Sequence, residues 1–135
     1  MKLLIDANIL LDVLQKREPH YRDSALIWKL CETEQAEGCI SALSIANLVY
    51  IMRKELSPET IEEVLGKLSL IFSIVELTPA DICKAAEMKW TDFEDALQAA
   101  TADRIHAEAI ITRNIRDFRK RRVIAFTPTE YLARI

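Results

Sequence analysis

The sequence contains little glycine, proline and cysteine, and each shortage excludes a class of protein. Its 135 residues include 2 glycines and 4 prolines in a chain that is 50% hydrophobic and 29% charged, which excludes collagen-like and disordered proteins. The 3 cysteines cannot all pair with one another and show no C-x-x-C spacing, which argues against a disulfide framework and a cysteine metal site. We expect all of them to be small buried residues. Length and composition fit a single domain over residues 1–135.

The sequence also lacks a long apolar run and a strong excess of one charge. No segment approaches the ~18 apolar residues of a membrane span, and Asp6, Asn8 and Asp12 interrupt the apolar start of the chain too early for a signal peptide. We therefore expect a cytoplasmic protein that does not bind membranes. The net charge is −3, so any contact with nucleic acid must come from a local basic patch.

Short apolar runs alternate with helical patterns along the whole chain. Alternating strands and helices need crossover connections, which give a parallel sheet with helices on both faces. Continuous apolar runs such as Leu3-Leu4-Ile5 are expected when both faces of a sheet are covered. We predict a three-layer α/β/α domain with a central, mostly parallel five-stranded sheet. The predicted strands are residues 2–5, 39–41, 73–77, 109–112 and 123–125.

Prolines and hydroxyl residues mark the predicted helix starts. Each proline can occupy a first helical position, where its missing N–H group costs nothing. On this basis Pro19 opens a helix that ends near Gly38. Thr127 and Glu130 have the spacing of a capping box around the last helix start. Thr91 is expected to cap the helix that follows it.

Acidic residues lie where predicted strands end or helices begin. Ligands of parallel α/β sheets bind outside the carboxyl ends of the strands. Asp6 directly follows the first strand, and Asp117 follows the fourth after a short basic turn. Asp92 and Asp95 share one face of the first turn of a helix. Taken singly, each has a structural alternative as a helix cap, a helix-dipole partner or an ion-pair partner.

Three segments together resemble the motifs of the PIN-domain nucleases. They are residues 4–12 (LIDANILLD), 95–102 (DALQAATA) and 111–118 (ITRNIRDF). The pattern T-R-N-x-x-D-F is the most specific of them, and all occur in the family's order over essentially the full chain. The resemblance implies a Rossmann-like sheet whose acids bind Mg²⁺ or Mn²⁺. Many small members of this family are ribonuclease toxins of VapBC-type toxin–antitoxin pairs.

The resemblance also implies roles for individual residues. It assigns metal binding and catalysis to Asp6, Asp95 and Asp117. Oxygen ligands without His or Cys suit Mg²⁺ or Mn²⁺ rather than zinc. No Ser, Cys or His constellation suggests a covalent nucleophile, so water activated by the metal ion would hydrolyse an RNA phosphodiester. The polar residues expected to support the acids or contact the substrate are Asn8 and Thr112, with Asn114 bracing the turn before Asp117.

One position departs from the family pattern. PIN nucleases usually carry a glutamate on the helix after the second strand, where this sequence has Asn47. An amide keeps an oxygen ligand but removes a negative charge, which weakens a site for a hard cation. Asp92, one turn from Asp95, is the candidate that restores the charge as a metal ligand. The substitution leaves an alternative function open, in which a catalytically weakened PIN-like domain binds RNA or protein.

A phosphoryl-transfer domain is a third hypothesis, which the sequence disfavours. A haloacid-dehalogenase pattern needs a second aspartate two residues after Asp6, where this chain has Asn8. A receiver domain needs an acidic pair at the first strand and an aspartate at the end of a central one. Neither is present.

A basic segment follows the third motif. Six Lys and Arg residues fall within ten positions that contain one acid, Asp117. A solvated loop would explain them, but beside a metal site we expect them to bind the RNA backbone. The family resemblance further implies a cognate antitoxin and a homodimer. The apolar helices over residues 45–52 and 61–72 could supply a dimer face, and core burial explains their apolar residues equally well. The basic residues are Arg113, Arg116, Arg119, Lys120, Arg121 and Arg122.

Overall fold

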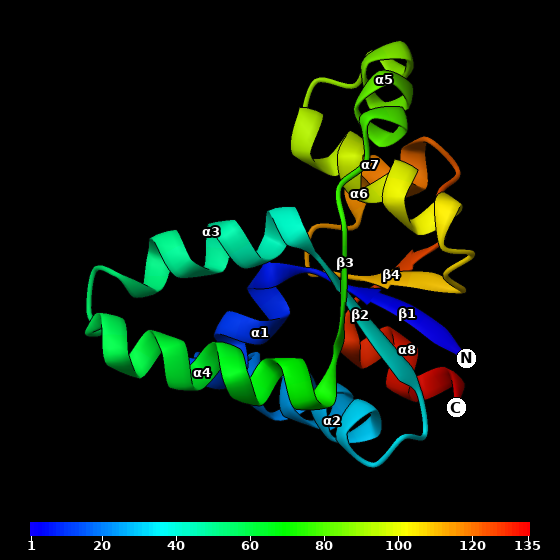
Figure 1. The fold of residues 1–135 in the computed structure, drawn as a ribbon. Coiled ribbons are helices and arrows are strands. Elements are labelled where there is room, and N and C mark those ends of the chain that lie inside the picture. Colours follow the sequence, from blue (N-terminus) through cyan, green and yellow to red (C-terminus); the bar gives the residue numbers. More distant parts are fainter.

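The computed structural model describes all of residues 1–135 and contains one five-stranded, wholly parallel sheet (Figure 1). The strand order is β3-β2-β1-β4-β5, so the chain builds outward from β1 in one direction and then in the other. The switch in direction lies between β1 and β4, where α/β sheets commonly bind ligands. The strands are β1 (Lys2–Ile5), β2 (Glu37–Ser41), β3 (Ser73–Val75), β4 (Ala109–Ile111) and β5 (Ala125–Phe126).

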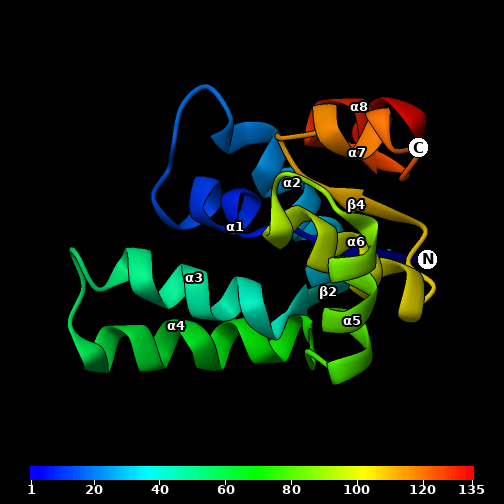
Figure 2. The same cartoon turned by 90° about the horizontal axis from the view of Figure 1, so that it is seen from above.

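Helices cover both faces of the sheet, which confirms the predicted α/β architecture. Figure 1 shows α5, α6 and α7 on one side of the sheet and α1, α2 and α8 on the other. Figure 2 shows α3 and α4 side by side, extending away from the sheet as a helical hairpin. The helices are α1 (Ala7–Leu14), α2 (Tyr21–Glu32), α3 (Ala42–Met52), α4 (Pro58–Ile71), α5 (Pro79–Met88), α6 (Phe93–Arg104), α7 (Arg116–Lys120) and α8 (Pro128–Arg134).

Alternate side chains of the central strand enter two separate apolar clusters. Leu3 and Ile5 pack into the larger cluster, with residues of α1, α2, α3, α4 and α8. Leu4 points to the other face and packs with Ala99 and Ala102 of α6. Both faces of β1 are therefore buried, as its continuous apolar sequence predicts.

Several helix starts follow the predicted capping chemistry, and others differ. Thr127 and Glu130 form the expected capping box at α8. Pro19 does not open the second helix, because α2 begins at Tyr21. The cap of α6 is Asp92 rather than Thr91, since Asp92 Oδ1 accepts a hydrogen bond from the backbone nitrogen three residues later at 3.1 Å. Carboxylates and hydroxyls are comparable caps, so the sequence pattern does not separate these neighbours.

The second strand packs closely on α2 through a glycine. A Cβ added at Gly38 would lie 2.6 Å from Cys31 Sγ and 2.7 Å from the Phe72 ring. Gly38 lies in β2 and does not end the preceding helix. A residue without a side chain is needed there because any Cβ would collide with these neighbours. Cys31 and Cys39 are buried, whereas Cys83 is exposed on α5, so the burial expected for the third cysteine is wrong.

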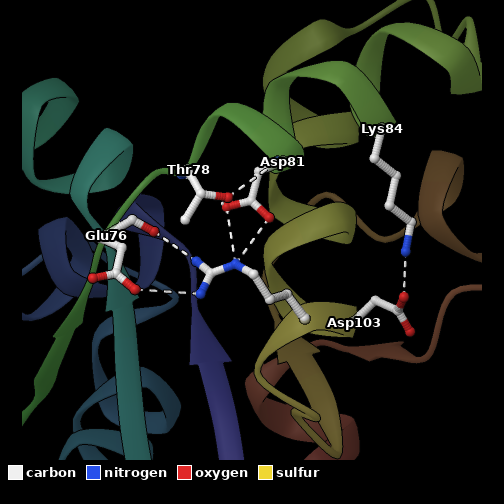
Figure 3. A network of polar contacts seen from close by, with 6 residues as sticks. Glu76, Thr78, Asp81, Lys84 and Asp103 are labelled. Atoms are coloured by element: carbon white, nitrogen blue, oxygen red, sulfur yellow. Dashed lines mark hydrogen bonds and ion pairs between the residues drawn. The ribbon is translucent and has the colours of Figure 1, made fainter.

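An ion-pair network connects the far end of α6 to the first turn of α5 and the segment before it (Figure 3). The Arg104 Nε donates to both carboxylate oxygens of Asp81, at 2.9 and 3.1 Å, and its Nη2 donates to the Glu76 carbonyl at 2.7 Å. Asp81 is buried and also accepts from the Thr78 backbone nitrogen. These contacts fix the direction of α6, whose first turns carry the candidate acids.

No helix has the length and apolar character of a membrane span.

Candidate metal centre

A pocket of about 490 Å³ lies at the carboxyl ends of the central strands, between α1, α3 and α6. Its polar lining combines carboxylates with neutral amides from four separate parts of the chain. One basic side chain, Arg17, reaches its wall. The polar residues of this acidic pocket are Asp6, Asn8, Arg17, Ser44, Asn47, Tyr50, Asp92, Glu94, Asp95, Gln98 and Asn114.

Asp6 is held where β1 passes into α1. As the cap of that helix it accepts a hydrogen bond from the Ala7 backbone nitrogen at 2.7 Å. Its second oxygen accepts from Thr112 Oγ1 at 2.8 Å and from Asn8 Nδ2 at 3.5 Å. Burial raises the pKa of Asp6 above its usual value, and the hydrogen bond from Thr112 opposes that shift. The structure thus places Asn8 and Thr112 beside Asp6, where the sequence predicted polar support.

Asp95 enters the same pocket from α6 and is nearly buried. Its carboxylate accepts a hydrogen bond from Asn114 Nδ2 at 3.4 Å. Burial first, and then the negative charges of Asp92, Asp6 and Asp117, raise the pKa of Asp95 to about 7. No lysine or arginine forms an ion pair with it. Several carboxylates in one low-dielectric pocket repel one another, and a bound cation relieves that repulsion.

The structure places Asp117 differently from the other two predicted acids. It lines a neighbouring hollow of about 60 Å³ with Trp90, Lys120 and Arg121. Asp92 borders both hollows, so it stands between Asp117 and the acidic pocket. No three His, Cys, Asp or Glu side chains come close enough together to form a ready metal cluster. Asn114, expected to brace the turn before Asp117, donates its backbone nitrogen to Thr112 Oγ1 at 3.1 Å within that turn and its side-chain amide to Asp95.

The pocket also contains residues that sequence reasoning did not assign to it. Gln98 is 4% exposed, and its Nε2 donates to Ser44 Oγ at 3.1 Å. Glu94, which the sequence explains as an acid at a helix start, accepts a hydrogen bond from Asn47 Nδ2 at 3.3 Å. The oxygens Gln98 Oε1 and Asn8 Oδ1 are buried without any hydrogen-bond donor. The spacing of Glu94, Asp95 and Gln98 along one helix was the available sequence signal.

Two of the six basic residues expected to bind RNA have acidic partners within the fold. Arg113 Nε and Nη2 donate to the buried carboxylate of Asp12 at 3.0 and 3.2 Å. Arg119 pairs with Glu130 at 2.7 Å. These ion pairs give both arginines a structural role, and their contact with RNA stays a prediction. The basic residues that form no ion pair are Arg116, Lys120, Arg121 and Arg122.

The wholly parallel sheet and the acidic pocket at its direction switch are those of an α/β protein that binds its ligand at the carboxyl ends of its strands. Among models of protein families, that of the PIN domain matches residues 2–116. The chain therefore belongs to the PIN-domain family. A comparison with curated protein sequences finds no match.

Solved structures support the same fold at low sequence identity. A chain of VapBC2 from Rickettsia felis, bound to promoter DNA, is 19% identical with a TM-score of 0.72, over 94% of this chain and 98% of that one. A toxin–antitoxin complex from Klebsiella pneumoniae matches at 22% identity and TM-score 0.73, over 93% and 97%. VapC20 from Mycobacterium tuberculosis, a toxin that cleaves the sarcin-ricin loop, matches at 12% and 0.69, over 90% and 96%.

Proposed function

We propose that this protein is a divalent-metal-dependent endoribonuclease and the toxin of a toxin–antitoxin pair. The observation that carries the proposal is the meeting of Asp6 and Asp95, 89 positions apart in the sequence, in one pocket where neither forms an ion pair. Membership of the PIN-domain family supports the reaction class. The RNA-cleaving activity in the name of the VapC20 structure belongs to that protein and makes RNA the substrate to test first.

The residues of the acidic pocket fit a hard divalent cation. Their ligand atoms are all oxygens, and the unpartnered amide oxygens of Asn8 and Gln98 can accept a cation as readily as a donor. Asp6 and Asp95 would hold Mg²⁺ or Mn²⁺, with Asp92 at the edge of the pocket. A bound ion of this kind acidifies water and stabilises negative charge on a phosphodiester.

The protein's own residues prepare that chemistry. Thr112 and the backbone of Ala7 fix both oxygens of Asp6, so the carboxylate needs no reorientation when substrate arrives. Asn114 steadies Asp95 in the same way. Asp117 lies in the adjoining hollow, and its negative charge contributes to the raised pKa of Asp95. We therefore include it among the proposed acids of the site.

The unpaired basic residues around α7 are the proposed RNA contacts. Lys120 and Arg121 line the hollow that holds Asp117, next to the acidic pocket. Arg116 and Arg122 extend the same basic surface without ion-pair partners. A phosphate backbone that follows this surface would reach the acids at its edge, and its affinity should fall as salt rises.

The proposed partners are a cognate antitoxin and a second copy of the chain. Chains of similar fold were crystallised in toxin–antitoxin complexes, which supports the first. The α3–α4 hairpin exposes two large apolar residues, Tyr50 and Leu70, which are 70% and 88% accessible, and we propose this hairpin as the dimer face.

A non-catalytic RNA- or protein-binding domain remains the second candidate because of Asn47. An amide at this position leaves the acidic pocket one carboxylate short of the family pattern. A Mn²⁺ titration by calorimetry separates the two functions, since a degenerate pocket would bind no metal.

Cleavage of RNA with Mg²⁺ or Mn²⁺, compared with EDTA, tests the proposed function. We expect Asp6→Asn and Asp95→Asn each to abolish the metal-dependent cleavage. Asp103→Asn is the matched control, because that aspartate is exposed and pairs with Lys84 away from the pocket. Cleavage by either pocket variant at the rate of the control would remove the assignment.

A further inference from the structure

The first turns of α6 present three polar side chains to the acidic pocket rather than one. Glu94, Asp95 and Gln98 all line it. Residues three and four apart share a helix face, so Gln98 lies beneath both acids. Of the three, the family resemblance assigns metal binding only to Asp95. Glu94 has no role in the proposed function, and Gln98 enters it only as one of two unpartnered amide oxygens.

Asn47 makes a specific contact with Glu94. The Asn47 Nδ2 donates to Glu94 Oε2 at 3.3 Å, from α3 to α6. No lysine or arginine pairs with Glu94, so its charge is not neutralised within the protein. The amide therefore stands where the family usually has a carboxylate and holds a carboxylate from the neighbouring helix in the same pocket.

A buried oxygen next to this pair points to a ligand. Gln98 is 4% exposed, its amide nitrogen is used by Ser44, and its Oε1 has no donor. Buried acceptors without a partner are rare in folded proteins because losing water without a replacement is costly. Carboxylate and amide oxygens around one polar pocket are the ligands that Mg²⁺, Mn²⁺ and Ca²⁺ take. Asp92 is the alternative carboxylate, but it borders the hollow of Asp117 as well as this pocket.

We propose that Glu94 is a ligand of the divalent cation and supplies the carboxylate that position 47 lacks. Asn47 is its positioning residue, and Gln98 contributes a neutral oxygen to the same cation. The inference rests on the proposed function. Compared with the family pattern, one acidic ligand would come from α6 instead of α3, and the pocket would hold the same number of carboxylates.

Calorimetric titration of the metal-free protein with Mn²⁺ tests this assignment without any RNA. We expect Glu94→Gln to weaken Mn²⁺ binding by at least about tenfold, because losing a direct carboxylate ligand should cost no less than losing a partner that only supports a ligand. Glu87→Gln removes the same charge from an exposed site on α5 and should leave affinity unchanged. Adding Asn47→Glu to Glu94→Gln should restore the affinity, because it returns a carboxylate to the other side of the contact.

Each outcome separates this inference from the proposed function. If the unaltered protein binds Mn²⁺ and Glu94→Gln matches Glu87→Gln, the inference is overturned and the metal-dependent function stands. If Asp92→Asn weakens binding and Glu94→Gln does not, the missing charge comes from Asp92, and the inference is again wrong. An unaltered protein that binds no Mn²⁺ overturns both. Thermal unfolding of each variant confirms that it is folded, which is expected because Glu94 is exposed.

Discussion

Replacing Arg113 should damage the stability of the protein rather than its contact with RNA. This arginine lies inside the most specific family motif, among residues that the sequence assigns to RNA binding. In the structure its guanidinium makes two hydrogen bonds to Asp12, a carboxylate that is 0% exposed. The remaining partner of that carboxylate is Ser24 Oγ at 3.0 Å. Arg113→Gln would therefore leave a buried negative charge without a cation.

The structure sets the size of the effect. Removing one partner of a fully buried ion pair costs about 3–5 kcal/mol, since the other charge stays buried. The Arg113 side chain is 31% exposed, so water can enter the vacated space and reduce the penalty. We expect a loss of about 2–3 kcal/mol in the free energy of unfolding. For a domain of this size that loss lowers Tm by about 7–10 °C.

Urea and thermal unfolding of Arg113→Gln and Arg116→Gln give the comparison directly. Arg116 is an exposed arginine of the same segment with no ion pair, so its replacement should change stability by less than about 0.5 kcal/mol. Adding Asp12→Asn to Arg113→Gln should recover part of the loss, because a neutral amide is less costly to bury. If Arg113→Gln were as stable as the Arg116 control, the structural role assigned to this arginine would be refuted.

Further predictions concern pH, packing and substrate binding. Burial and neighbouring carboxylates raise the pKa of Asp95 from 3.8 to about 7. In EDTA, the stability that the folded protein gains by holding this carboxyl group protonated is therefore complete below about pH 4 and is lost as pH rises through 7. Asp95→Asn should flatten the dependence of Tm on pH in that window, and Mg²⁺ should raise Tm more at about pH 8 than at about pH 5; equal effects at both would contradict the charge argument. Gly38→Ala should destabilise the protein by about 1–3 kcal/mol in urea unfolding, because the added Cβ would lie 2.6 Å from its nearest neighbour. Gly66→Ala, with nothing within 4 Å in α4, should stabilise it by about 0.5–1 kcal/mol, and the opposite order of the two variants would exclude the packing explanation. Neutralising Lys120 and Arg121 together should raise KM for RNA more than it lowers kcat, with a weaker dependence on salt; an unchanged KM would remove them from the RNA surface.

Local sequence signals were sufficient for the order of the strands and of every helix except α7, a short helix in the segment that the sequence suggested was a basic turn. Apolar runs and their spacing placed β1, and the capping box at Thr127 and Glu130 placed the start of α8. Errors occurred where two local solutions have similar free energies. Asp92 and Thr91 are both good caps, and Gly38 can end a helix or enter a strand. The docking of β2 on α2 decided the second case, and that contact is not visible in a local window.

The sequence by itself carried the family resemblance in three motifs. Its alternating apolar runs and helical patterns predicted the parallel sheet and the acids at the carboxyl edge, because these features depend on residues close together in the chain. Only the tertiary structure decided which side chains meet. Arg113 contacts Asp12 from 101 positions away, and Asn47 contacts Glu94 across 47. Both contacts depend on how α1, α3 and α6 dock against the sheet. The partner of a long polar side chain is set by that docking, because a charge pairs with whichever opposite group its buried position leaves within reach.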